Sequence, residues 1–230
     1  MLTEKQTGLT GTQLKTIALV LMVLDHIHYF FEFTGGIPIL FSMLGRLSAP
    51  LFLFCTVEGF AHTHDRKRYF LRIWAIGAGM AALEFFMMYA HAFRRGDDFY
   101  PANAIFQDFV LLCIVWQGMD WLQAKKFAKG LAAIAAVLCW PFVAAAFLSA
   151  FPQVQQTPWA STAVAFVITS PLPLWSSITD GGWDYLLGGV VLYALRNHRR
   201  LQVAAWAAVT FLSEFGFVVF MMHGQPGFVW

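Results

Sequence analysis

The chain has 230 residues, of which 59% are hydrophobic, 17% are aromatic and only 12% are charged. Because about 25% of residues are charged in an average soluble domain, this composition excludes an ordinary soluble protein and predicts an all-α bundle of transmembrane helices. The formal net charge of +2 is too small to indicate a nucleic-acid-binding protein, so we expect no nucleic-acid partner.

Seven apolar runs have the length of a helix, although the sixth is short for a full membrane span. They cover residues 13–33, 38–62, 69–91, 103–122, 130–151, 183–196 and 201–222. Between the fifth and the sixth run, residues 152–182 hold an apolar stretch that is too short to span and is followed by prolines. We interpret this insertion as a re-entrant or interfacial segment, and the whole chain, 1–230, as one integral-membrane domain.

Basic residues in the short loops predict the orientation. The clusters at His64–Arg72, Lys125–Lys129 and Arg196–Arg200 all lie on one side of the membrane if the chain crosses it seven times. We therefore expect a membrane protein that is surrounded by lipid and has its N-terminus in the cytoplasm. Three widely spaced cysteines fit neither a disulfide framework nor a Cys-x-x-Cys site, and we expect no metal.

The first apolar run contains an acid and an imidazole, Asp25 and His26. If Lys15 marks the cytoplasmic edge, His26 lies roughly 16 Å deeper at about 1.5 Å per residue, near the middle of a hydrocarbon core about 30 Å thick. Ionisable groups at that depth are costly and are usually functional. The alternative is a structural role, in which Asp25 pairs with Arg46 of the second run and no chemistry takes place.

Arg46 stands four residues before Pro50 in the second run. Because proline has no N–H, the carbonyl of Arg46 loses its helical partner, and the helix is expected to open there. Arg46 could pair with Asp25 or could stabilise negative charge that develops on a substrate oxygen. The two roles are compatible, since structural ion pairs also occur within active sites.

Two motifs stand in fixed order: LKTIALVLMVLDHI at residues 14–27 and GRLSAPLFLFCTVEGFAHT at Gly45–Thr63, followed by a basic segment. Together they closely resemble the TraX family, whose named member is a membrane acetylase that N-acetylates conjugative pilin. Asn103–Phe106 and Trp183–Tyr193 are similar to later segments of the family. The last run departs from the family pattern and offers only His223.

The resemblance implies transfer of an acetyl group from acetyl-CoA to an acceptor amine, and the preferred acceptor is the N-terminus of a pilin-like protein. An α-amino group has a pKa of about 8 and must lose its proton before it attacks, so a base is needed. We assign that role to His26, assisted by Asp25 and Arg46. Further residues that could act in the site or line it are Glu58, Glu84, Asn103 and Asp184.

The phosphates of acetyl-CoA need cations at the cytoplasmic edge. Lys15, Arg66, Arg68 and Arg72 are the candidates, although the positive-inside bias alone could explain the last three. Three other functions stay open: O-acetylation of a sugar or lipid hydroxyl, proton-coupled transport through a relay of buried charges, and a non-enzymatic role in pilus assembly.

Overall fold

The computed structural model describes residues 9–90, 105–151, 156, 158–169, 172–175, 182–209 and 211. The described residues contain helices and no strand, which confirms the all-α prediction. Five of these helical segments are long and apolar enough to cross a membrane. They are Gly11–Thr34, Leu40–His62, Arg66–Met87, Ile105–Gln123 and Phe127–Ala150.

The chain divides into two compact units, residues 1–62 and 63–230, which are considered separately below. That the whole chain forms one domain stays a prediction. Many large apolar side chains within the first helix are exposed, among them Ile17, Leu19, Val20 and Val23. Soluble proteins rarely expose such continuous apolar surface, whereas a lipid-facing helix requires it.

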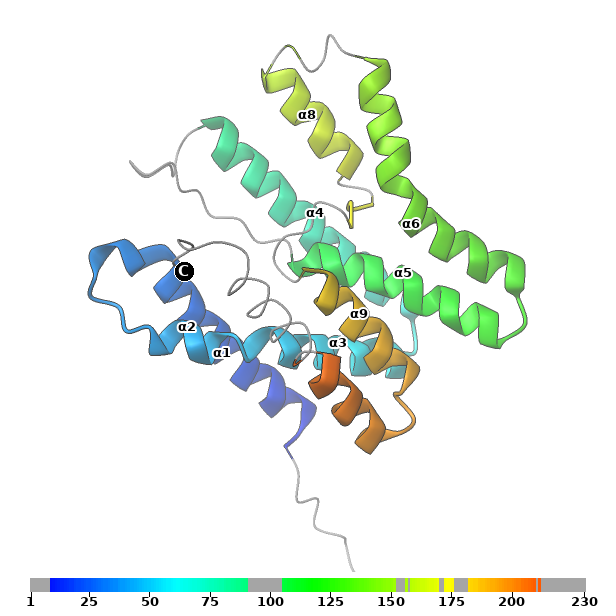
Figure 1. Ribbon diagram of the computed structural model, residues 1–230, viewed down its shortest axis with the longest axis horizontal. Coiled ribbons are helices and arrows are strands. Elements are labelled where there is room, and N and C mark those ends of the chain that lie inside the picture. Colours follow the sequence, from blue (N-terminus) through cyan, green and yellow to red (C-terminus); the bar gives the residue numbers. More distant parts are fainter. Residues whose placement is uncertain are drawn as a thin grey trace, which may run out of the picture. The chain divides into compact units, whose positions relative to one another are not determined.

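The first unit contains α1 (Gly11–Phe31), the short 3-10 helix η1 (Glu32–Thr34), α2 (Leu40–Gly45) and α3 (Ser48–His62). A capping box begins α1: the Thr10 hydroxyl accepts the N–H of Gln13 at 3.2 Å, and the Gln13 side chain accepts the N–H of Thr10 at 2.8 Å. Helix α1 packs against both α2 and α3 (Figure 1).

The second predicted span is interrupted, because α2 ends at Gly45 and α3 begins at Ser48. This break confirms the opening expected from Pro50, which lies in the first turn of α3 and has no N–H for the carbonyl of Arg46. The first turn of a helix tolerates proline because its N–H groups have no helical acceptor. The sequence therefore places the break directly after Gly45.

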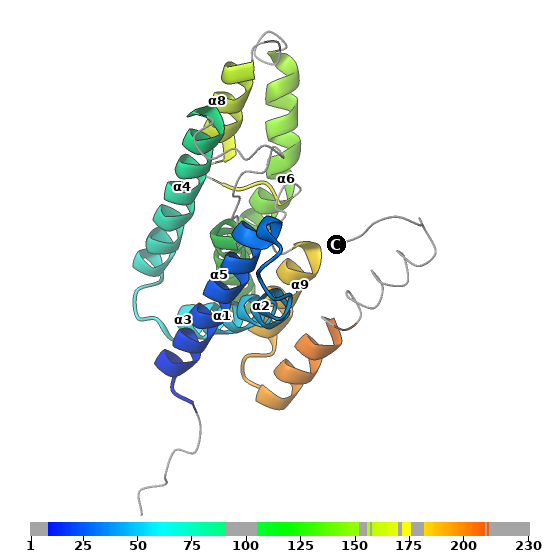
Figure 2. The same cartoon turned by 90° about the vertical axis from the view of Figure 1, so that its left-hand side faces the viewer.

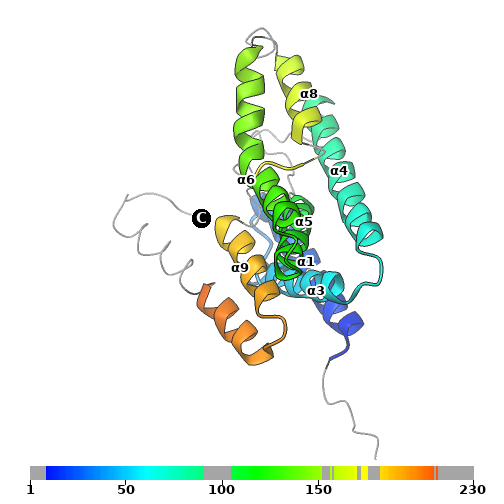
Figure 3. The same cartoon turned by 90° about the vertical axis from the view of Figure 1, so that its right-hand side faces the viewer.

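The second unit contains α4 (Arg66–Ala90), α5 (Ile105–Gln123), α6 (Phe127–Ala150), α8 (Pro158–Thr169) and α9 (Gly182–Ala194), and residues 199–209 are also helical. Helix α5 packs against α4, α6 and α9 (Figure 3). Its close approach to α6 requires Gly118 and Gly130, since a Cβ on Gly130 would lie 2.8 Å from the Gly118 carbonyl oxygen. The turn between these helices is tight, and Lys125 adopts the left-handed conformation (φ 58°).

The described part of the insertion at 152–182 packs against two helices of this unit. Helix α8 has 12 residues, too few for a full span as predicted, and it lies beside α4 (Figure 2) with Phe166 stacked on Phe85 at 5.2 Å between ring centroids. Further along, the Trp175 indole donates a hydrogen bond to the Leu138 carbonyl at 3.1 Å. Leu138 lies three residues before Pro141, which has no N–H to donate within the hydrogen-bond ladder of α6.

Candidate functional site

The imidazole of His26 is held by the main chain of its own helix. Its Nδ1 lies 2.9 Å from the carbonyl oxygen of Met22, and the side chain is partly buried. Because a carbonyl can only accept a hydrogen bond, Nδ1 must donate and therefore carries the proton. In the neutral ring the basic lone pair is then on Nε2.

Asp25 lies against the end of α2. A Cβ placed on Gly45 would overlap the Asp25 side chain, with 2.5 Å to its Oδ1 and 2.6 Å to its Cγ. Only glycine therefore allows α1 and α2 to approach with the carboxyl group between them. The packing brings Asp25 to the residue that immediately precedes Arg46.

Arg46 follows the last residue of α2 and forms its C-cap. Its N–H donates to the Ser42 carbonyl at 3.0 Å, and its side chain is exposed. The structure thus brings the break in the second span next to the carboxyl group of the first span. That Asp25, His26 and Arg46 form one site stays a prediction, as do their chemical roles.

Lys15 and Glu58 belong to the opposite end of the same unit. Both lie close enough to the buried thiol of Cys55 to interact with it electrostatically. Cys55 is ten residues beyond Gly45 along the chain. Glu58 is also close to His62, whose Nδ1 lies 3.9 Å from the carboxylate and 3.0 Å from the Glu58 carbonyl oxygen. Glu58 is therefore placed with Lys15, away from the Asp25–Gly45 contact.

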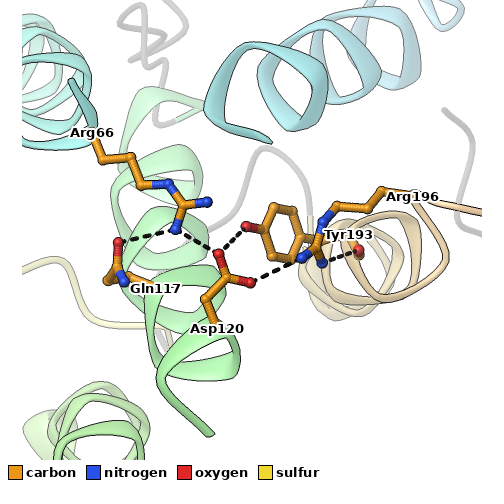
Figure 4. A network of polar contacts seen from close by, with 5 residues as sticks. All are labelled: Arg66, Gln117, Asp120, Tyr193 and Arg196. Atoms are coloured by element: carbon orange, nitrogen blue, oxygen red, sulfur yellow. Dashed lines mark hydrogen bonds and ion pairs between the residues drawn. The ribbon is translucent and has the colours of Figure 1, made fainter. Parts of the chain in front are cut away.

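In the second unit, a single carboxylate binds two arginines and a tyrosine (Figure 4). Asp120 of α5 forms an ion pair with Arg66 of α4, and it accepts the Tyr193 hydroxyl at 2.8 Å and the Arg196 guanidinium at 3.0 Å. Arg66 also donates to Gln117 at 3.3 Å. We call these five side chains the Asp120 network; it ties α4, α5 and the end of α9 together.

Aromatic stacking holds one side of the Asp120 network. The Arg196 guanidinium lies 4.1 Å from the centroid of the Tyr193 ring, and Tyr193 stacks on Trp116 at 5.2 Å and 16°. Trp116 is fully buried and donates its indole N–H to the Gly189 carbonyl at 3.0 Å. Every layer of this stack is therefore fixed by a hydrogen bond as well as by packing.

The other predicted site residues of this unit are dispersed along its helices. Arg68 lies near Asp65, with 3.8 Å between Nε and a carboxylate oxygen, and both side chains are largely exposed. Arg72 is exposed on α4, and Glu84 is partly buried farther along the same helix. Asn103, the side chain of Asp184 and the C-terminal His223 lie outside the described residues.

Sequence reasoning did not find Gln117, Asp120 or Tyr193. A usable signal was present, because Asp120 is an acid at the end of an apolar run and two predicted basic clusters flank the membrane on the same side.

In the described parts of the chain, no three His, Cys, Asp or Glu side chains gather in a way that could hold a metal ion.

Residues 10–147 match the family described as TraX protein. This interval includes both helix α1 with Asp25 and His26 and the Asp120 position, and it ends before α8 and α9. Neither a curated protein nor a solved structure matches the chain.

Proposed function

Since the match covers more than half of its length, the chain belongs to the TraX family, and we propose that it is a membrane acetyltransferase. Its donor is acetyl-CoA, and its acceptor is an amine, with the N-terminus of a pilin-like protein as the preferred substrate. The observation that supports this proposal most strongly is the position of His26, held with Nδ1 on the Met22 carbonyl in an apolar helix.

That contact suits a general base. With Nδ1 protonated, Nε2 can accept a proton from the attacking amine, and the ring cannot rotate without losing its hydrogen bond to the main chain. Asp25 precedes His26 and adds a negative charge that stabilises the imidazolium once it forms. The tight Asp25–Gly45 contact fixes the position of that charge.

The proposed reaction is a direct transfer. The neutral amine attacks the thioester carbonyl, a C–N bond forms, and negative charge develops on the carbonyl oxygen, where Arg46 would stabilise it. Nε2 of His26 takes the proton that the amine loses. As the C–S bond breaks, the same proton passes to the sulfur of CoA, so the base is regenerated and the products are an amide and a thiol.

The donor would enter from the cytoplasm of a bacterial cell, with the N-terminus of the protein on the same side of the inner membrane. Lys15 and Arg72 are exposed and suit the phosphates of acetyl-CoA, and Arg68 adds a third cation near the start of α4. Arg66 is a further candidate for the same role, and its guanidinium also contacts Asp120 and Gln117.

The experiment uses purified full-length protein in lipid nanodiscs, radiolabelled acetyl-CoA and a pilin-like protein with a free N-terminus. We expect label in the acceptor, and mass spectrometry should place one acetyl group on the terminal nitrogen. The control acceptor has a blocked N-terminus and should stay unlabelled. Transfer to the blocked acceptor would favour hydroxyl acetylation, and no transfer to any acceptor would refute the enzyme assignment.

A further inference from the structure

The Asp120 network joins two basic segments that are far apart in sequence. Residues 64–72 supply Arg66 and residues 196–200 supply Arg196, and both guanidiniums contact the same carboxylate. Their side chains are 34% and 18% exposed, so they are partly removed from water. A bias toward positive cytoplasmic loops explains why both segments are basic, but it does not require that they converge on one acid.

The charges in this network do not cancel. One carboxylate offsets one of the two arginines, so the cluster keeps about one positive charge in surroundings where water screens it only partly. The exposed side chains of Lys67 and Arg200 add to that charge, whereas Asp65 offsets the charge of the nearby Arg68. Such a cluster suits an anion with several charges rather than a single carboxylate.

Arg199 is held in place by a buried amide. Gln202 is fully buried, its amide nitrogen donates to the Leu192 carbonyl at 2.8 Å, and its oxygen accepts from Arg199 at 2.8 Å. Leu192 is next to Tyr193, so the same turn of α9 positions both Arg199 and the Tyr193–Arg196 stack. An exposed arginine that is fixed in this way loses less side-chain entropy when it binds a ligand.

We infer that residues 64–72 and 196–200 form a binding site for the phosphate groups of coenzyme A, with Arg196 and Arg199 as the main contacts. This inference rests on the proposed function. It moves the phosphate site from the α4 segment alone to a surface that also includes the turn after α9. Asp120 is a positioning residue here, because it holds Arg66 and Arg196 without contacting the phosphate.

The test measures binding of CoA and of 3′-dephospho-CoA to the full-length protein by calorimetry, in nanodiscs of zwitterionic lipid. Arg199→Gln should weaken CoA binding about tenfold, because a hydrogen bond between charged groups is lost. It should weaken 3′-dephospho-CoA binding less, since that ligand has fewer phosphate charges. Lys129→Gln, an equal change of charge at an exposed position in the first turn of α6, should leave both affinities unchanged.

Arg196→Gln provides the second variant, and its melting temperature shows whether the fold survives. A folded Arg196→Gln protein should also lose about tenfold in CoA affinity. Equal losses of CoA affinity in Lys129→Gln and Arg199→Gln would overturn the inference, because they would show that CoA is attracted by the overall positive charge and not by a specific site. Unchanged CoA binding in Arg199→Gln would overturn it as well.

Phosphate groups also occur in anionic lipids, and a second arm separates the two sources. The site binds lipid headgroups, and the inference is wrong, if three results are found together. Anionic nanodiscs stabilise the wild type, the Arg199→Gln variant lacks that stabilisation, and its affinity for CoA equals that of the wild type. If the wild type transfers acetyl groups while Arg199→Gln binds CoA normally, only this inference fails. If the wild type does not bind CoA, the proposed function fails with it.

Discussion

The carboxyl group of Asp25 lies directly against the backbone of Gly45, so closely that a Cβ on Gly45 would overlap it. This contact joins the acid of the first span to the break in the second span, where Pro50 prevents a continuous helix. Sequence alone placed the two features on different helices. The packing of α1 on α2 brings them together.

Gly45→Ala should therefore displace Asp25 and reduce acetyl transfer by tenfold or more while the protein still inserts and folds. The added methyl group has no space, so either the helices separate or the carboxyl group moves. The matched control is Gly79→Ala in α4, where a Cβ meets nothing within 4 Å. That variant should keep its activity and gain up to about 1 kcal/mol of stability. Equal activity in both variants would contradict the role of the contact.

Asp120→Asn should lower thermal stability markedly, because the positive charges of Arg66 and Arg196 then lose the carboxylate with which both of them pair. Removing one partner of a partly buried ion pair costs on the order of 3 kcal/mol. Tyr193→Phe removes one hydrogen bond to the same carboxylate and should cost about 1 kcal/mol. Denaturation followed by tryptophan fluorescence would rank the two variants, and the reverse order would contradict the account of the network.

Much of the fold was predictable from sequence because hydrophobic run length determines membrane spans with little ambiguity. The five long helices begin and end within a few residues of the predicted runs. The break at Arg46 followed from the covalent structure of Pro50. By contrast, the predicted span at 183–196 corresponds to the 13-residue α9. The described part of the predicted span at 201–222 is helical, its later residues lie outside the described part of the chain, and a total of seven spans stays a prediction.

The partners of Asp120 could not be predicted, because they depend on which helix faces which. Asp120, Arg66 and Tyr193 are separated by more than fifty residues from one another, and no local pattern indicates that α5 lies between α4 and α9. For the same reason the sequence did not reveal that Arg66 pairs with Asp120. Residue type indicates that a charge needs a partner, and only tertiary packing identifies it.

Lys15→Gln combined with Arg72→Gln should raise the KM for acetyl-CoA severalfold and leave kcat nearly constant. Both side chains are exposed, so their contacts with phosphate would be made equally in the ground state and in the transition state. Steady-state kinetics at several acetyl-CoA concentrations would measure the effect. A large fall in kcat with a constant KM would show that these residues do not bind phosphate.

Orientation can be tested with introduced cysteines. In a background without Cys55, Cys113 and Cys139, a cysteine at Gln155 should react with an impermeant thiol reagent from the periplasm, and one at Lys126 should be protected in intact cells. This expectation follows from the basic loops and seven predicted spans. Labelling at Lys126 but not at Gln155 would invert the orientation and move the cluster at residues 64–72 away from cytoplasmic CoA.

The central claim is that His26 is the base, and one measurement tests it most directly: acetyl transfer by His26→Ala in nanodiscs at saturating acetyl-CoA. His62→Ala is the matched control, since His62 has the same contact between Nδ1 and the carbonyl four residues earlier but is 77% exposed. We predict that His26→Ala folds, with a melting temperature within a few degrees of that of the wild type. Its kcat should fall on the order of a hundredfold to ten-thousandfold, whereas His62→Ala should stay active. Near-normal turnover by a folded His26→Ala protein would contradict the account.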